Sequence, residues 1–256
     1  MRKSFLLILL LLTIVLTSCD SGFHPIRKSD FNGHTIGVLE GSLQSQIVIK
    51  SAPKARFVVY KSDKEVLDAL GKGHCDAAFV DYQDVYSEAF KRNNLAIAFV
   101  DADRQPIGGA FNKEDTLLCE KFRKYLRTIK ANGLYVNMEN RWLATSRPDT
   151  VSPPKLKMPK GGVPLRIATE GELIPYSIYK QGQWTGFENE LWTRFALWLG
   201  RSVEFVVVDF NDLFNTLKKR KADVAISTIT ITEERSMRVL FSPEYAYTSS
   251  VCLIRK

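Results

Sequence analysis

Two stretches of the chain, residues 65–81 and 212–228, follow the same pattern without a gap. "EVLDALGKGHCDAAFVD" and "DLFNTLKKRKADVAIST" each consist of a short amphipathic helix, a basic or glycine break, a small residue before an aspartate, and an apolar strand. Another apolar strand precedes each helix, "RFVVY" in the first case and "VEFVVV" in the second. Strands that alternate with helices at this spacing indicate parallel βαβ units. The sequence therefore predicts an α/β fold with two lobes of similar design, each a mostly parallel sheet flanked by helices.

The segments around this repeat predict how the lobes begin and where they are separated. Ser62 followed by Glu65 is a capping-box pattern that starts the first helix. "TSRPDTVSPPKLKMPKGG", residues 145–162, contains four prolines and two glycines, and therefore predicts a linker. Before it, residues 114–133 predict an amphipathic helix with one apolar face, formed by Leu118, Phe122, Tyr125, Leu126 and Ile129.

The N-terminal stretch "MRKSFLLILLLLTIVLTSC" has the features of a secretory signal. Arg2 and Lys3 give it a basic start, and the apolar run that follows is too short to span a bilayer comfortably. Leu16-Thr17-Ser18-Cys19 resembles the lipobox of bacterial lipoproteins, in which the chain is cut before the cysteine and lipid is attached to it. We therefore expect a lipoprotein that Cys19 anchors to the membrane, on the periplasmic side of the cell envelope. The alternative is an ordinary membrane anchor or a buried helix.

Charge and cysteine spacing exclude several classes of function. Removing residues 1–18 lowers the net charge from +8 to +6, and the basic residues are scattered, so we expect a solvated surface and no nucleic acid partner. Cys75, Cys119 and Cys252 match no metal motif and are interpreted as small buried hydrophobes, with one disulfide as the alternative. The three histidines lie in unrelated contexts. No GxSxG, HExxH, Walker or dinucleotide motif is present, so neither a cofactor, a metal nor a catalytic residue is predicted.

Three stretches run in order through the last ninety or so residues: "LRIATEGELIPYSIYKQGQWTGFENELW", "VEFVVVDFNDLFNTL" and "DVAISTITITEERSMRVLFSPEY". They resemble the first lobe of the periplasmic solute-binding proteins for polar amino acids, family 3, the glutamine-binding protein type. Earlier in the chain, "FNGHTIGVLEGSLQS", "EVLDALGKGHCDAAFVDYQ" and "PIGGAFNKEDTLL" resemble the second lobe of the same family. "IKANGLYVNMENRWL" resembles the end of its closing helices.

The resemblance implies a two-lobe periplasmic binding protein fold of type II in circularly permuted order, because the second-lobe-like half comes first. We expect "YTSSVCLIRK" to stop where relatives cross between the lobes, so that both termini lie near the hinge. The alternatives are a fragment of a tandem protein or a domain-swapped dimer, whereas permutation predicts a monomer. The expected segments are a signal peptide (1–18), a tether (19–30), a second-lobe-like lobe (31–107), a hinge return with closing helices that pack on the other lobe (108–143), a linker (144–162) and a first-lobe-like lobe (163–256).

Members of this family hold an α-amino acid in the cleft between the lobes, and the resemblance assigns roles to matched positions. Arg235 matches the arginine that grips the α-carboxylate, since a planar guanidinium can donate two hydrogen bonds to it. Asp81 matches the acid that takes the ammonium group, and Phe210 matches the aromatic residue that packs on the aliphatic part. The other expected contacts are Thr230, backbone groups near Thr228, the turn of Gly41 and Ser42, and Glu170, which faces the ligand's side chain.

The resemblance implies a receptor that delivers an amino acid to an ABC permease or presents it to a sensor. Glu170 replaces a shorter aspartate and Leu173 an aromatic residue of relatives, so the identity of the amino acid stays open, with a dipeptide or another small amine-bearing acid as alternatives. The second hypothesis is an enzyme on the same scaffold, since some members of the family are cyclohexadienyl or arogenate dehydratases. In that case Glu170 would be the acid that protonates the leaving hydroxyl group. The third hypothesis is a ligand-sensing module that acts with a partner chain.

Overall fold

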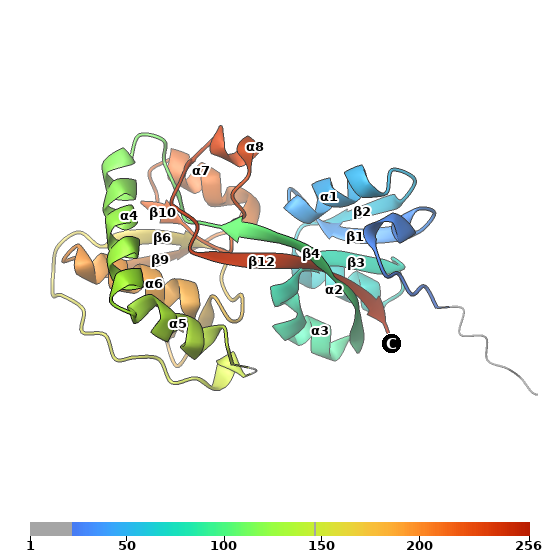
Figure 1. Cartoon of the computed structure of the whole chain (residues 1–256), viewed down its shortest axis with the longest axis horizontal. Coiled ribbons are helices and arrows are strands. Elements are labelled where there is room, and N and C mark those ends of the chain that lie inside the picture. The colour runs from blue at the N-terminus through green and yellow to red at the C-terminus, as the bar shows by residue number, and fades with distance from the viewer. Residues whose placement is uncertain (1–21, 146) are drawn as a thin grey trace, which may run out of the picture.

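The computed structural model describes residues 22–145 and 147–256. It contains two lobes, each built on a five-stranded sheet with helices packed against it, and two long strands cross from one lobe to the other (Figure 1). This confirms the predicted two-lobe α/β fold. The predicted signal peptide and Cys19 lie outside the described residues. Within these residues, no helix combines the length and apolar character that crossing a membrane requires.

Lobe A is the lobe that comes first in the chain. Its sheet has the strand order β2-β1-β3-β12-β4, and β1 pairs in parallel with both β2 and β3. The predicted cap is confirmed, because the Ser62 hydroxyl accepts a hydrogen bond from the Glu65 N–H at the start of α2, whereas the Glu65 carboxylate accepts from the Lys61 N–H and not from Ser62 as in a complete capping box. The elements of lobe A before the crossing are η1 (Lys28–Phe31), β1 (Thr35–Leu39), α1 (Leu43–Ser51), β2 (Arg56–Tyr60), α2 (Asp63–Gly71), β3 (Ala77–Asp81), η2 (Tyr82–Tyr86) and α3 (Glu88–Arg92).

Lobe B follows the first crossing. Its sheet has the order β11-β5-β10-β6-β9, and β6 pairs in parallel with both β9 and β10. Its elements are β5 (Ala110–Phe111), α4 (Thr116–Ala131), α5 (Leu134–Trp142), η3 (Pro148–Thr150), β6 (Leu165–Thr169), β7 (Ile178–Lys180), β8 (Gln183–Thr185), α6 (Phe187–Trp198), β9 (Val203–Val207), η4 (Phe210–Asp212), α7 (Leu213–Lys218), β10 (Val224–Ala225), α8 (Glu233–Ser236) and β11 (Leu240–Phe241).

The two sheets share one plan. In each, the first parallel strand lies between the other two, as β2-β1-β3 in lobe A and β9-β6-β10 in lobe B. In each, the fourth strand is antiparallel and follows a crossing of the chain, since β12 pairs with β3 and β5 pairs with β10. The helix and strand of the predicted repeat correspond to α2 and β3 in lobe A and to α7 and β10 in lobe B. The sequence repeat is therefore confirmed as a structural repeat.

Two antiparallel strands, β4 (Leu95–Ile107) and β12 (Ala246–Arg255), run between the lobes (Figure 1). They pair from Ala246 opposite Ile107 to Arg255 opposite Leu95. The last strand does not stop at the hinge as expected, because it continues through sheet A between β3 and β4 and ends at the far side of lobe A. Most of this strand, assigned in advance to the lobe that begins at residue 163, thus belongs to the sheet of lobe A.

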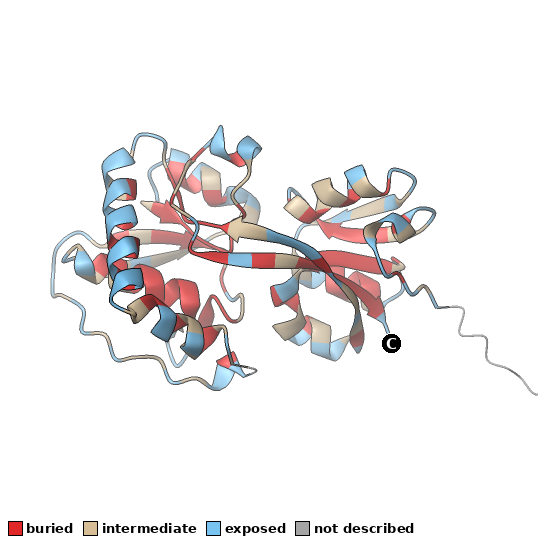
Figure 2. Ribbon diagram, in the orientation of Figure 1, coloured by how far each residue is buried: buried red, intermediate tan, exposed pale blue. Residues whose placement is uncertain are grey.

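Each sheet separates two apolar cores, because successive side chains of a strand point to opposite faces. In β3, Ala78 and Val80 pack with α2 and α3, whereas Ala77 and Phe79 pack with α1. In lobe B, Ile167 of β6 packs toward α4, α5 and α6, and Ala168 packs toward α7. Figure 2 shows the buried residues gathered in the strands and on the inner faces of the helices. Cys75, Cys119 and Cys252 are buried and unpaired, as predicted.

The closing helices α4 and α5 pack on lobe B, and the described part of the linker runs along the outside of the same lobe (Figure 1). The Glu190 carboxylate of α6 joins α5 to lobe B. It accepts hydrogen bonds from Arg141 Nη1 (2.8 and 2.9 Å), Trp142 Nε1 (2.7 Å) and Arg194 Nε (2.7 Å), and it is 3% exposed. These charge-assisted hydrogen bonds to a buried carboxylate hold α5 against α6 and stabilise its packing on lobe B.

Replacing Glu190 with alanine should therefore destabilise the protein strongly. The change leaves Arg141, Trp142 and Arg194 without their acceptor, and losing one partner of a buried ion pair costs about 3–5 kcal/mol. Urea denaturation measures the loss in free energy of unfolding. Glu114→Ala is the control, since it removes an exposed ion pair with Arg220 and should cost less than about 1 kcal/mol. Equal losses in both variants would contradict this role for Glu190.

Candidate functional site

Side chains from both lobes meet in a small cleft beside the crossing strands. The cleft has a volume of about 20 Å³ and is lined from lobe A by Leu39, Ser42, Leu43, Gln44, Asp63 and Asp81. Lobe B contributes Glu170, Leu173, Phe210, Ser227, Thr228, Thr230 and Arg235. All ligand-binding residues expected from the sequence line this one cleft, except Gly41, which contacts Arg235 through its backbone. The structure thus brings together residues that lie almost 200 positions apart in the chain.

Arg235 lies at one end of this cleft, in the short helix α8. Thr232 caps the helix by accepting a hydrogen bond from the Arg235 N–H (3.2 Å). The guanidinium donates to the Thr230 carbonyl (Nη1, 3.1 Å) and to the Gly41 carbonyl of the other lobe (Nη2, 3.3 Å), and it lies 5.4 Å from the centre of the Phe210 ring. Arg235 is 8% exposed, and burial lowers its pKa. A buried cation whose partners are neutral carbonyls and a ring is suited to bind an anion such as a carboxylate.

Asp81 faces the same cleft from the end of β3. Its carboxylate accepts a hydrogen bond from Gln44 Nε2 (2.8 Å), and the same amide donates to the Ser250 hydroxyl of β12 (3.3 Å). Gly41 marks a close approach of the lobes. It has a φ of +66°, and a Cβ there would lie 2.8 Å from Oδ1 of Asn211 in lobe B. A side chain at this position would be strained and would displace the Asn211 side chain.

Ser42 and Thr228 line the cleft, but the Ser42 hydroxyl and the Thr228 N–H already have partners within the protein. The Ser42 hydroxyl donates to the Leu39 carbonyl (2.8 Å) and accepts from the Ser45 N–H (3.1 Å), so it caps helix α1. The Thr228 N–H donates to both carboxylate oxygens of the buried Glu188 (3.2 and 3.1 Å). Ser227 and Thr228 have φ values of +137° and +46°, which Glu188 helps to hold. Direct ligand contacts from Ser42 and Thr228 stay predictions.

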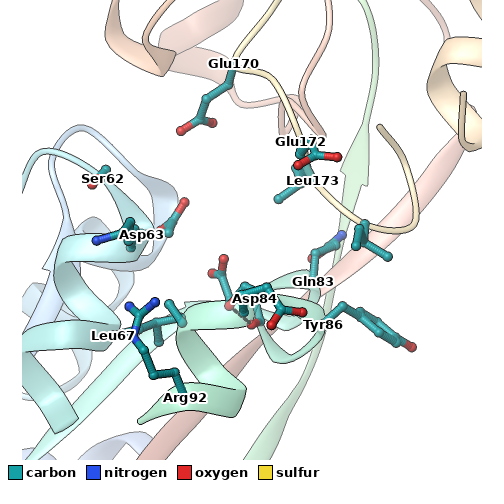
Figure 3. Close-up of a pocket in the computed structure, with 15 residues that line it drawn as sticks. Ser62, Asp63, Leu67, Gln83, Asp84, Tyr86, Arg92, Glu170, Glu172 and Leu173 are labelled. Carbon is teal, nitrogen blue, oxygen red and sulfur yellow. Dashed lines mark hydrogen bonds between the residues drawn. The ribbon is translucent and has the colours of Figure 1, made fainter. Parts of the chain in front are cut away.

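A larger cavity of about 360 Å³ adjoins the cleft (Figure 3). Asp63, Glu170 and Leu173 line both spaces, so the two are neighbours and these side chains lie between them. Figure 3 shows the carboxyl ends of Asp63, Asp84 and Glu170 pointing toward a common space from three different elements. The remaining lining residues of this cavity are Ser62, Lys64, Leu67, Gln83, Tyr86, Ser87, Glu88, Ala89, Arg92, Glu172 and Ile174.

Burial and mutual repulsion disfavour the charged form of these acids. Burial, the largest cause, raises the pKa of Asp63 to about 6, that of Asp81 to about 7 and that of Glu170 to about 8. The neighbouring Asp63 carboxylate adds to the upward pKa shifts of Asp81 and Glu170. The pKa of Asp84 is raised well above its ordinary value by burial and by the charges of Asp63, Asp81 and Glu170. The cleft therefore holds a cation at one end and a crowded set of acids beyond it.

Asp63 and Asp84 were missed by sequence reasoning. Asp63 directly follows the Ser62 cap, where an acid is common because it interacts favourably with the helix N-terminus, so it gave no separate signal. Asp84 lies in η2, in the polar run that follows the buried strand β3. Such a run at a strand end is a weak indication of a binding residue. Among the described residues, no group of three or more His, Cys, Asp and Glu side chains could hold a metal ion.

Part of the chain is similar in sequence to known proteins. The sequence profile of the bacterial extracellular solute-binding proteins, family 3, matches residues 165–256. The chain is 34% identical over 135 residues to the arginine-binding extracellular protein ArtP of Bacillus subtilis, a match that covers 50% of this chain and 51% of that protein. It is 25% identical over 111 residues to the ABC transporter glutamine-binding protein GlnH of the same organism, covering 43% and 41%.

A solved periplasmic substrate-binding protein of an ABC transporter from Coxiella burnetii is 12% identical, with a TM-score of 0.43, and the match covers 86% of this chain and 84% of that one. The chain spans about half or less of the length of the two curated relatives named above. Residues 165–256 match the family 3 profile, and the resemblance to polar amino acid solute-binding proteins is confirmed.

The raised pKa values of the cleft acids predict how stability changes with pH. In the unfolded chain these carboxyls ionise near pH 4, whereas in the folded protein Asp63, Asp81, Asp84 and Glu170 keep protons to higher pH. The folded state thus binds more protons in between, so its free energy of unfolding should fall from about pH 5 to pH 8, by on the order of 2 kcal/mol.

Urea denaturation of the protein without added amino acids, at several pH values, measures this slope. Asp209 and Arg235 are the other charged groups that act on these acids. The paired Asp68 and Asp223 have lowered pKa values, so their effect falls at lower pH, outside this window. Asp84→Asn should flatten the slope, because it removes one of the buried titrating groups. A free energy of unfolding that stays level or rises over this range would contradict the assignment.

Proposed function

We propose that the protein captures a free amino acid in the cleft between its lobes and delivers it to an ABC importer. The observation that carries this proposal is the convergence of Arg235, Phe210, Thr230 and Glu170 of lobe B with Asp81 of lobe A on one cleft. Arg235 binds the α-carboxylate, and Asp81 binds the α-ammonium group. The two charged groups of an amino acid are thus matched by opposite charges from opposite lobes, which supports closure of the lobes around the ligand.

The names of the relatives support binding rather than catalysis. Both curated relatives described above are named as binding proteins, one of them as part of an ABC transporter. The alternative hypothesis of a dehydratase used Glu170 as its acid, and the names of these relatives do not support it. We therefore assign Glu170 to the ligand's side chain. Lipid attachment at Cys19, which would keep the protein at the membrane beside its permease, belongs to the same proposal.

We also propose that the lobe order is a circular permutation of the family's order. The family profile matches residues 165–256, which form most of lobe B and the crossing strand β12. Lobe A, whose strand order repeats that of lobe B, and the helices α4 and α5 that pack on lobe B come before it in the chain. In this arrangement one chain supplies both walls of the cleft, and the protein acts as a monomer. The linker between α5 and β6 then joins elements that are chain ends in relatives.

Arg235→Ala tests the proposed function. Removing one partner of a buried charge pair should weaken amino acid binding by roughly 2–5 kcal/mol, enough to turn micromolar affinity into millimolar. Thermal-shift screening of the common amino acids identifies the ligand, and calorimetry then measures its affinity. Arg235→Lys should restore binding in part, because an ammonium keeps the charge but cannot donate two parallel hydrogen bonds to a carboxylate.

Arg238→Ala is the matched control. Arg238 lies one turn along the chain, is exposed and stacks on Phe214 outside the cleft, so its removal should leave affinity unchanged. Undiminished affinity in Arg235→Ala, with the fold intact by urea denaturation, would refute the assignment of the carboxylate.

A further inference from the structure

We propose that the cleft selects an amino acid whose side chain ends in a cation, and that Asp63, Asp84 and Glu170 form the subsite for that cation. This inference rests on the proposed function, because it assumes that Arg235 and Asp81 hold the α-carboxylate and the α-ammonium group. It adds the chemical class of the side chain, which the resemblance to the family leaves open. The class comprises basic amino acids such as arginine, lysine and ornithine.

The position of the larger cavity supports this inference. The cleft beside Arg235 is small, about 20 Å³, whereas the neighbouring cavity on the other side of Asp63, Glu170 and Leu173 measures about 360 Å³. In the proposed arrangement, a ligand held at Arg235 and Asp81 directs its side chain past the shared residues Asp63, Glu170 and Leu173 into this cavity. Leu67, Leu173 and Ile174 give its wall apolar surface for the methylene groups of a long side chain. Asp63, Asp84 and Glu170 lie where the end of such a side chain would arrive (Figure 3).

Asp84 supplies an independent observation. It is 4% exposed, and its Oδ2 atom is buried without a hydrogen-bond partner in the structure. Its carboxyl group points into the cavity, toward Asp63 and Glu170 (Figure 3). A buried carboxyl oxygen without a hydrogen bond destabilises the folded protein. A hydrogen bond from a donor group of the ligand would offset this cost. The carboxyl group at the cavity wall thus includes a buried oxygen that lacks a donor.

The basic residues on the cavity wall already have acidic partners. Lys64 Nζ donates to Asp68 (2.9 Å), and Arg92 Nη2 donates to the same carboxylate (2.5 Å). In the described part of the chain, no Lys or Arg side chain forms a salt bridge with Asp63, Asp84 or Glu170. Three clustered carboxyls without a basic partner create a strongly negative site once they ionise. A cation on the ligand would reduce the repulsion among these carboxylates and would give them a partner of opposite charge.

The arrangement fits an organic cation better than a metal ion or a neutral side chain. The carboxyls come from α2, η2 and the end of β6 and do not gather as metal ligands do among the described residues. A guanidinium carries five N–H donors and an ammonium three, so either can reach acceptors that lie on several sides. A neutral amide such as that of glutamine would leave the carboxylate charges uncompensated.

Calorimetry with the whole protein tests the inference through pairs of ligands that differ mainly in charge. L-arginine is compared with L-citrulline, which has nearly the same shape but a neutral end, and L-lysine with L-glutamine. We expect at least one cationic ligand to bind on the order of 100-fold more tightly than its neutral counterpart, as is typical of a buried charge pair. Asp84→Asn should reduce the affinity for that cation by on the order of 10-fold or more and leave citrulline binding nearly unchanged.

Asp103→Asn is the matched control, because it removes the same charge from an exposed aspartate that pairs with Lys28 outside the cavity. Glu170→Gln gives a second variant of the subsite. If citrulline or glutamine binds as tightly as the cations, the cationic subsite is wrong, although capture of an amino acid stands. If no amino acid binds, the proposed function fails as well. Stabilisation by Ca²⁺ or Zn²⁺ alone that Asp84→Asn abolishes would replace the organic cation with a metal and overturn the inference.

Discussion

The pairing of β4 with β12 is the constraint on which the rest of the structure depends. These strands run antiparallel from one lobe into the other, and each contacts a different wall of the cleft. Ser250 of β12 pairs with Asp81 in sheet A, and Ile107 of β4 forms a bridge with Thr230 in lobe B. The strands therefore set the distance between the groups assigned to the ammonium and carboxylate ends of the ligand. We expect the lobes to move about these strands, because two extended strands can bend more readily than two packed lobes can deform.

Electrostatics then divides the space between the lobes into two parts. Arg235 is a buried cation among carbonyls at one end, and Asp63, Asp84 and Glu170 form a set of acids at the other, with Asp81 between them. Desolvation makes each of these charges unfavourable in the absence of a partner. A ligand with one anionic and two cationic groups would compensate most of them at once. The buried charges that lower the stability of the ligand-free protein would thus provide affinity and selectivity for the ligand.

The sequence predicted the lobes and most of the cleft because their signals are local. The repeat of α2 and β3 by α7 and β10, the Ser62 cap and the apolar face of α4 all arise from short-range patterns. Asp63 and Asp84 could not be found in this way, since they become a cluster only when α2 and η2 approach β6 of the other lobe. The prediction that β12 stops at the hinge was wrong for a related reason. Strand pairing over 170 residues decides where this strand ends, and no local pattern records it.

The structure of the protein with L-arginine bound is the most direct test of the central claim, that one cleft uses opposite lobes for the two ends of one amino acid. The account predicts the α-carboxylate paired with the Arg235 guanidinium, the α-ammonium group within hydrogen-bonding distance of Asp81, and the side-chain cation among Asp63, Asp84 and Glu170. A ligand bound in the reverse orientation, or held by one lobe alone, would contradict it.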